Sequence, residues 1–149
     1  MFRHILIPTD GSKLAAKGAR AGVKLAKALG AKVTGLYVIF PYVPPVYGEA
    51  ALYYVPGASV QESKKLFEKQ AKKALAAIEI EARAARVPCS GQVVTRDQPW
   101  RAILRAARAR KCDLIVMASH GRGGIGGLIL GSETTHVLAN SRIPVLVVR

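Results

Sequence analysis

The sequence has little cysteine and no long uninterrupted apolar run. Its two cysteines, Cys89 and Cys112, do not form a Cys-x-x-Cys pair, so neither a disulfide framework nor a zinc site is predicted. The nearest approach to a membrane span, residues 36–46, is broken by three prolines and falls short of ~20 residues. Residues 1–8 have too short an apolar core for a signal peptide. We therefore expect a cytoplasmic protein.

Acidic residues are also scarce: 9 of them stand against 23 Lys and Arg, for a formal net charge of +14. Basic residues recur every three or four positions in two segments, which is the spacing of one helix face. These residues are Lys13, Lys17, Arg20, Lys24 and Lys27 in the first segment and Arg101, Arg105 and Arg108 in the second. The favoured interpretation is two solvated helix faces. The alternative is attraction to nucleic acid or an anionic membrane. Aromatic residues are not interleaved with the basic ones, so the usual pattern for stacking on single-stranded bases is missing.

Apolar runs and amphipathic segments alternate along the 149 residues, a length that fits one domain with a substantial core. Continuous apolar strands separated by amphipathic helices predict a parallel sheet with helices on both faces. Strands are expected at residues 5–8, 32–39, 92–96, 114–118 and 143–149, and helices at 12–29, 59–85, 99–110 and 133–140. Residues 40–58 form an irregular segment rich in Pro, Tyr, Gly and Val. We predict a single doubly wound α/β domain over residues 1–149, with a five-stranded parallel sheet.

A glycine-rich stretch follows the fourth predicted strand. Five glycines lie between Gly121 and Gly127, and Gly131-Ser132 opens the last helix. A strand, a glycine-rich loop and a helix N-terminus together form a typical phosphate site, because glycines let backbone amides approach an anion. The stretch contains no P-loop string. It does contain Gly-x-Gly-x-x-Gly, but that dinucleotide motif belongs after the first strand of a βαβ unit.

Several candidate residues follow the carboxyl ends of predicted strands, where ligands bind in doubly wound sheets. Asp10 follows the first strand, Val38 closes the second, and residues 118–121 follow the fourth. If the first and fourth strands flank the point where strand order reverses, these residues meet in one crevice.

The spacing Ala118-x2-Gly121-x9-Gly131-Ser132 resembles the signature of the ATP-binding branch of the universal stress protein family. Residues 5–12, 113–121 and 143–149 extend the resemblance over essentially the whole chain. The resemblance implies a five-stranded parallel sheet, a homodimer formed through the last strand (Val145 to Val148), and ATP binding. Because the loop has no carboxylate, Mg²⁺ is expected to be held mainly by phosphates and waters, with Ser132 or Asp10 as the candidate protein ligands.

Carried over by position, the resemblance assigns roles to particular residues. The triphosphate is expected against the amides of Gly121, Gly131 and Ser132, and Asp10 is expected at the ribose or adenine end. The backbone near Val38 is expected at the adenine edge, with Met117 and Ala118 on the pocket floor. The full predicted site comprises Pro8, Thr9, Asp10, Val38, Met117, Ala118, His120, Gly121, Arg122, Gly124, Gly131, Ser132, Glu133 and Thr134.

Some of these residues have a structural alternative. Asp10 and Ser132 are natural helix caps whether or not a ligand binds. His120 and Arg122 either supply charge to the phosphates or are exposed loop side chains, and exposure is favoured for His120. His136, outside this set, is expected to be a surface or interface residue rather than a catalytic one. Ala118 departs from the family signature, which has glycine there. Its methyl either crowds the ribose and phosphates or is tolerated because φ is negative.

The expected function is a nucleotide-dependent regulatory dimer in which hydrolysis is absent or slow. General acid–base catalysis requires a positioned titratable group. The loop offers only His120, and no carboxylate occurs between Asp113 and Glu133. Two alternatives remain open: a binding protein for AMP or cyclic AMP, and a nucleotide-free interaction protein that uses its basic surface.

Overall fold

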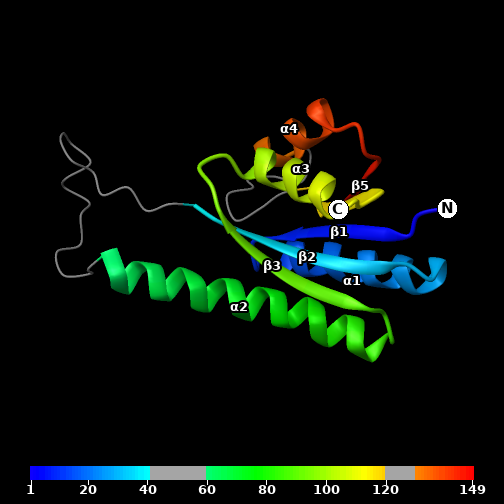
Figure 1. The fold of residues 1–149 in the computed structure, drawn as a ribbon, viewed down its shortest axis with the longest axis horizontal. Helices are drawn as coiled ribbons and strands as arrows, with labels where there is room; N and C mark the ends of the chain where they lie inside the picture. The colour runs from blue at the N-terminus through cyan, green and yellow to red at the C-terminus, as the bar shows by residue number, and fades with distance from the viewer. Residues whose placement is uncertain (41–59, 120–129) are drawn as a thin grey trace.

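The computed structural model describes residues 1–40, 60–119 and 130–149 of the chain. Strands and helices alternate in this part of the chain (Figure 1). In order, the elements are β1 His4–Thr9, α1 Lys13–Leu29, β2 Lys32–Ile39, α2 Val60–Ala84, β3 Cys89–Thr95, α3 Pro99–Ala109, β4 Leu114–Ala118, α4 Ser132–Asn140 and β5 Val145–Val148.

The strands form one five-stranded parallel sheet in the order β3-β2-β1-β4-β5. β1 lies in the middle and pairs with β2 on one side and β4 on the other. Strand order thus reverses between β1 and β4, which is the arrangement of a doubly wound α/β fold. The predicted fold class is confirmed, and β5 lies at a sheet edge as expected.

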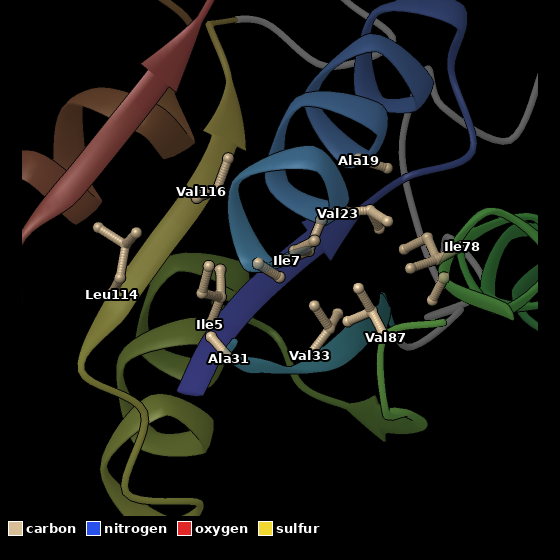
Figure 2. Close-up of a cluster of buried hydrophobic side chains, with 12 residues drawn as sticks. Ile5, Ile7, Ala19, Val23, Ala31, Val33, Ile78, Val87, Leu114 and Val116 are labelled. Carbon is tan, nitrogen blue, oxygen red and sulfur yellow. The ribbon is translucent and has the colours of Figure 1, made fainter. Parts of the chain in front are cut away.

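Each face of the sheet has its own hydrophobic core, because successive side chains along a strand point to opposite faces. Ile5 and Ile7 of β1 pack with residues of α1 and α2, including Val23 and Ile78 (Figure 2). Leu6, between them in sequence, packs on the other face with residues of α3 and α4. Of the described helices, α1 and α2 therefore cover one face of the sheet, and α3 and α4 cover the other.

Most predicted boundaries hold to within one or two residues, but β3 begins earlier than predicted, and β5 begins two residues later. β3 begins at Cys89, three residues before the predicted start, and pairs with β2 from Val33↔Cys89 onward. It is an edge strand whose first residues, Cys89-Ser-Gly91, lack the apolar pattern that predicts a strand. β5 begins at Val145 rather than at residue 143, since the Ile143 amide donates to Ser141 Oγ and Pro144 has no amide hydrogen. The predicted irregular segment, residues 40–58, lies outside the described residues except for Phe40.

Polar contacts stabilise the sheet at the amino-terminal ends of its strands. Both carboxylate oxygens of Asp113 accept backbone amides of β1 and its approach, from Arg3 at 2.8 Å and from His4 at 2.9 Å. Desolvation opposes ionisation of Asp113, but the backbone amides of His4, Arg3 and Asp113 itself, together with the charge of His4, outweigh it and lower the pKa of the carboxyl. Nε2 of His4 lies 2.8 Å from Thr34 Oγ1, and burial, together with the charge of Lys32, lowers the pKa of the imidazole. These contacts have a structural role, and they lie at the opposite end of the strands from the predicted site.

Candidate functional site

The candidate site lies where β1 and β4 end side by side. Thr9 ends β1, and Ala118 ends β4. The start of α4 is fixed to the end of β4 by two hydrogen bonds: the Gly131 amide donates to the Ser119 carbonyl at 2.8 Å, and Thr134 Oγ1 donates to the Ala118 carbonyl at 3.0 Å. The N-terminus of α4 therefore lies beside the carboxyl end of β4.

Asp10 shapes the turn between β1 and α1. Its Oδ1 accepts the Ser12 amide at 2.9 Å, and Ser12 Oγ in turn accepts the Ala15 amide at 3.1 Å as the N-cap of α1. Gly11, at φ 79°, donates its amide to Thr9 Oγ1 at 3.1 Å, in a left-handed conformation that favours glycine. The structural role of Asp10 is thus present, and it is compatible with a ligand contact because the side chain is only half-buried.

The N-terminus of α4 lacks a side-chain cap. The N-cap residue is Gly131, at φ −61° and ψ 152°, so the expectation that Ser132 caps the helix is wrong by one residue. The first bond of the helix runs from the Thr135 amide to the Gly131 carbonyl at 2.9 Å. The amides of Ser132, Glu133 and Thr134 have no acceptor in the described part of the chain. Three unmatched amides at the positive end of a helix dipole favour an anion.

Ala118, where the family signature has glycine, is accommodated by the strand. Within residues 1–40, 60–119 and 130–149 the non-glycine residues with positive φ are Arg86 and Lys111, so Ala118 has an ordinary negative φ. By strand alternation its methyl lies on the same face as Leu114 and Val116, toward α1. The close approach of α1 depends on Gly18, where an added Cβ would lie 3.2 Å from the Ala118 nitrogen. The methyl therefore points away from the face covered by α4.

Met117 points to the opposite face from Ala118. It is buried in the core beneath α3 and α4, together with Leu6 and Ile115. Val38, at the end of β2, is half-buried and packs against the same core. Both residues lie near strand ends, as predicted, and their side chains pack in the hydrophobic core.

Glu133 has a partner that the sequence did not reveal. Its Oε2 accepts the backbone amide of Trp100, the second residue of α3, at 2.7 Å. The N-cap of α3, Gln98, makes no side-chain cap, and Pro99 has no amide hydrogen, so Trp100 carries the first unmatched donor. The signal in the sequence for such a partner was that α3 begins at Gln98-Pro99, which provides no side-chain cap. A carboxylate from α4 supplies the cap, and the side chain of Glu133 is directed to α3.

Four predicted site residues, His120, Gly121, Arg122 and Gly124, lie outside the described residues, as does most of the glycine-rich loop. Seven of the other ten lie at the ends of neighbouring elements: Pro8, Thr9 and Asp10 at the end of β1 and just after it, Ala118 at the end of β4, and Gly131, Ser132 and Thr134 at the start of α4. The side chains of Val38 and Met117 pack in the core, and that of Glu133 is directed to α3. In the described ranges, no group of three His, Cys, Asp or Glu side chains is placed to hold a metal ion. No helix in those ranges is long and apolar enough to cross a membrane.

Comparisons with known proteins give a consistent result. Residues 1–149 match the Universal stress protein family. The chain is 36% identical over 150 residues to a universal stress protein of Thermus aquaticus, and the match covers 100% of both chains. The solved structure of hypothetical protein MJ0577 is similar with a TM-score of 0.75 and 27% identity, over 99% of this chain and 96% of that one. A universal stress protein solved in complex with cAMP is similar with a TM-score of 0.68 and 24% identity, over 99% of this chain and 96% of that one.

The family match extends over the entire sequence, and the relative from Thermus aquaticus is similar along its full length. The sheet order β3-β2-β1-β4-β5, with β1 and β4 side by side in the middle, is consistent with these matches. The chain therefore belongs to the universal stress protein family.

Proposed function

We propose that this protein is an ATP-binding regulatory protein and that residues 1–149 form one nucleotide-binding domain. In this proposal the phosphates lie at the start of α4, and the nucleoside extends across the carboxyl ends of β1 and β2. Mg²⁺ is held by phosphate oxygens and waters rather than by a cluster of carboxylates. The cytoplasm, where ATP is abundant, is the proposed location.

The observation that carries the proposal is the uncapped N-terminus of α4. α1 has Ser12 as its cap, and α3 has Glu133. α4 begins at a glycine, and its first three amides have no acceptor in the described ranges. A phosphate group supplies the missing acceptor oxygens, and the exposed Ser132 side chain adds a hydroxyl donor at the same place.

The same residues do not favour fast hydrolysis. A general base must lie within hydrogen-bond reach of the attacking water. Glu133 is the carboxylate nearest in sequence to the phosphate position, and its Oε2 is already bonded to the Trp100 amide. We therefore propose slow or absent hydrolysis, so that bound ATP acts as a switch rather than as a substrate.

The proposal includes a homodimer formed through β5. As an edge strand, β5 pairs with β4 on one side and leaves backbone groups on its other side for a further strand. Leu146 is 43% exposed on this strand. If β5 pairs with β5 of a second copy around a two-fold axis, the exposed backbone groups of both strands become hydrogen-bonded.

A second candidate ligand is AMP or cyclic AMP. A universal stress protein of similar fold was solved with cAMP. A monophosphate also satisfies the amides at the start of α4, so this site alone does not select a triphosphate.

The test is the shift in melting temperature with ATP, AMP and cyclic AMP for the native protein and for Gly131→Val. A ligand at 100 times its Kd stabilises the folded state by ~2.7 kcal/mol, which is readily measured. We expect the largest shift with ATP and no shift in Gly131→Val, whose stability without ligand serves as the control. No shift with any adenine nucleotide at millimolar concentration overturns the proposal. A shift that survives in Gly131→Val contradicts the phosphate position.

A further inference from the structure

A second groove lies away from the candidate nucleotide site, between α3 and the end of α4. It has a volume of about 580 Å³, and we call it the arginine groove. Its lining comprises Trp100, Arg101, Leu104, Arg105, Arg108, Ala109 and Asn140. Three of these residues are arginines and none is acidic. A groove of this composition is suited to an anionic ligand.

The three arginines are arranged in a row along α3. They are spaced by four and three residues, which places them on one helix face over about 10 Å. All three are exposed, while the opposite face of α3 is buried against the sheet. Arg105 and Arg108 form no ion pair within the ranges that the structure describes. Like charges at this spacing repel one another and destabilise a helix, and a bound polyanion relieves this repulsion.

An aromatic stack stands at one end of the row. Trp100 and His136 have ring centroids 5.5 Å apart and an interplanar angle of 23°. The guanidinium of Arg101 lies 4.9 Å from the centroid of the Trp100 ring. His136 is exposed, although it comes from α4, 36 residues after Trp100 in the sequence. Aromatic residues are not interleaved with the basic ones in the sequence, but the fold places this stack beside the arginine row.

We propose that the arginine groove binds single-stranded nucleic acid. Guanidinium groups bind phosphates with paired N–H donors, and the row is long enough to follow several phosphates of one strand. Proteins that bind single strands combine such a positive groove with aromatic rings on which bases stack. An acidic peptide would bind to the arginines, but it has no bases to stack on the exposed ring of His136. The net charge of +14 adds long-range attraction toward a polyanion.

The test measures binding of labelled oligouridylate and oligothymidylate by fluorescence anisotropy over a salt series. Trp100 is the only tryptophan, so quenching of its emission reports occupancy of this groove directly. The key variant is Arg105→Gln with Arg108→Gln. The matched control is Lys17→Gln with Lys24→Gln, which removes the same charge from exposed positions of α1.

We expect the arginine variant to bind about tenfold more weakly than the native protein. The slope of log K against log salt should fall by about 1.4, from ~0.7 per lost phosphate contact on a single strand. The lysine control should lose much less, and His136→Ala should weaken oligonucleotide binding while leaving binding of inorganic polyphosphate unchanged. Equal losses in the arginine and lysine variants would show that net charge alone is responsible and would overturn the proposal.

Two further outcomes also overturn it: no binding at ~50 mM salt, and polyglutamate that competes as well as the oligonucleotides, which indicates an acidic protein partner. The melting shift with adenine nucleotides should be unchanged in the arginine variant. That control keeps the outcome for the arginine groove separate from the outcome for the nucleotide site.

Discussion

Replacing Glu133 by alanine should destabilise the protein because it removes the cap of a different helix. Glu133 Oε2 accepts the Trp100 amide at 2.7 Å, and Gln98 and Pro99 offer α3 no substitute. A hydrogen bond to a charged group contributes ~1.5–3 kcal/mol, and an anion at a helix N-terminus contributes a further ~0.3–1 kcal/mol. Since the side chain is partly exposed, we expect a loss of about 2 kcal/mol in the free energy of unfolding.

The conservative variant Glu133→Gln separates the hydrogen bond from the charge. Its amide oxygen can still accept from Trp100, so we expect a loss of ~1 kcal/mol or less. In a domain of this size ~1 kcal/mol corresponds to ~2–4 °C, so the melting temperature should fall by about 4–8 °C in Glu133→Ala and about half that or less in Glu133→Gln.

The assay is denaturant unfolding followed by circular dichroism and by emission of Trp100, the only tryptophan. Wild-type stability in Glu133→Ala, or equal losses in the two variants, would refute the capping role. If Glu133 instead contacts the nucleotide directly, Glu133→Gln will weaken ATP binding strongly while leaving the apo protein stable.

Three other perturbations test different parts of the structure. Burial lowers the pKa of His4 from 6.5, so its contribution to stability is present above pH 6.5 and is lost as pH falls below it; His4→Gln should flatten this part of a plot of unfolding free energy against pH. Ile115→Ala removes a fully buried side chain from the core beneath α3 and α4 and should cost ~2–5 kcal/mol by denaturant unfolding; a loss below 1 kcal/mol contradicts the packing. Leu146→Lys should convert the proposed dimer to monomer in sedimentation, whereas a native protein that is monomeric at micromolar concentration would rule out the β5 interface.

The central strands and the helices facing them could be predicted from sequence because their patterns are local. Residues 114–118 are uniformly apolar and form a strand buried along its whole length. Gly30 ends α1 in the predicted left-handed conformation, at φ 65°. Each of these signals depends on residues within one or two helical turns, where composition and conformation are directly linked.

Edge strands and contacts between distant residues were harder to predict. The beginning of β3 is defined by pairing with β2 and not by its own residues, since Ser90 and Gly91 favour strands weakly. The bond between Glu133 and Trp100 joins residues 33 positions apart, and the stack of Trp100 on His136 joins residues of different helices. The sequence shows that α3 needs a cap and that its arginines share a face. It does not show that α4 supplies the cap, Glu133, and the stacking ring, His136, because the fold places them there.

The site itself was predicted in part from position and in part from family resemblance. Strand order places the ends of β1 and β4 side by side, which sequence pattern alone left conditional. The effect of Ala118 was also undecided until its φ and the direction of its methyl were known. The glycine-rich loop, on which the resemblance rests most heavily, lies outside the described residues.

The most direct test of the proposed function is an NMR titration of the ¹⁵N-labelled protein with Mg-ATP, following individual backbone amides. The amides of Ser132, Glu133 and Thr134, which have no acceptor in the described ranges, should show large saturable shifts together with Gly131. The amides of Arg105 and Arg108 in the arginine groove should shift little in comparison. Saturating ATP that leaves the first turn of α4 unshifted, or that shifts only residues elsewhere, would contradict the account.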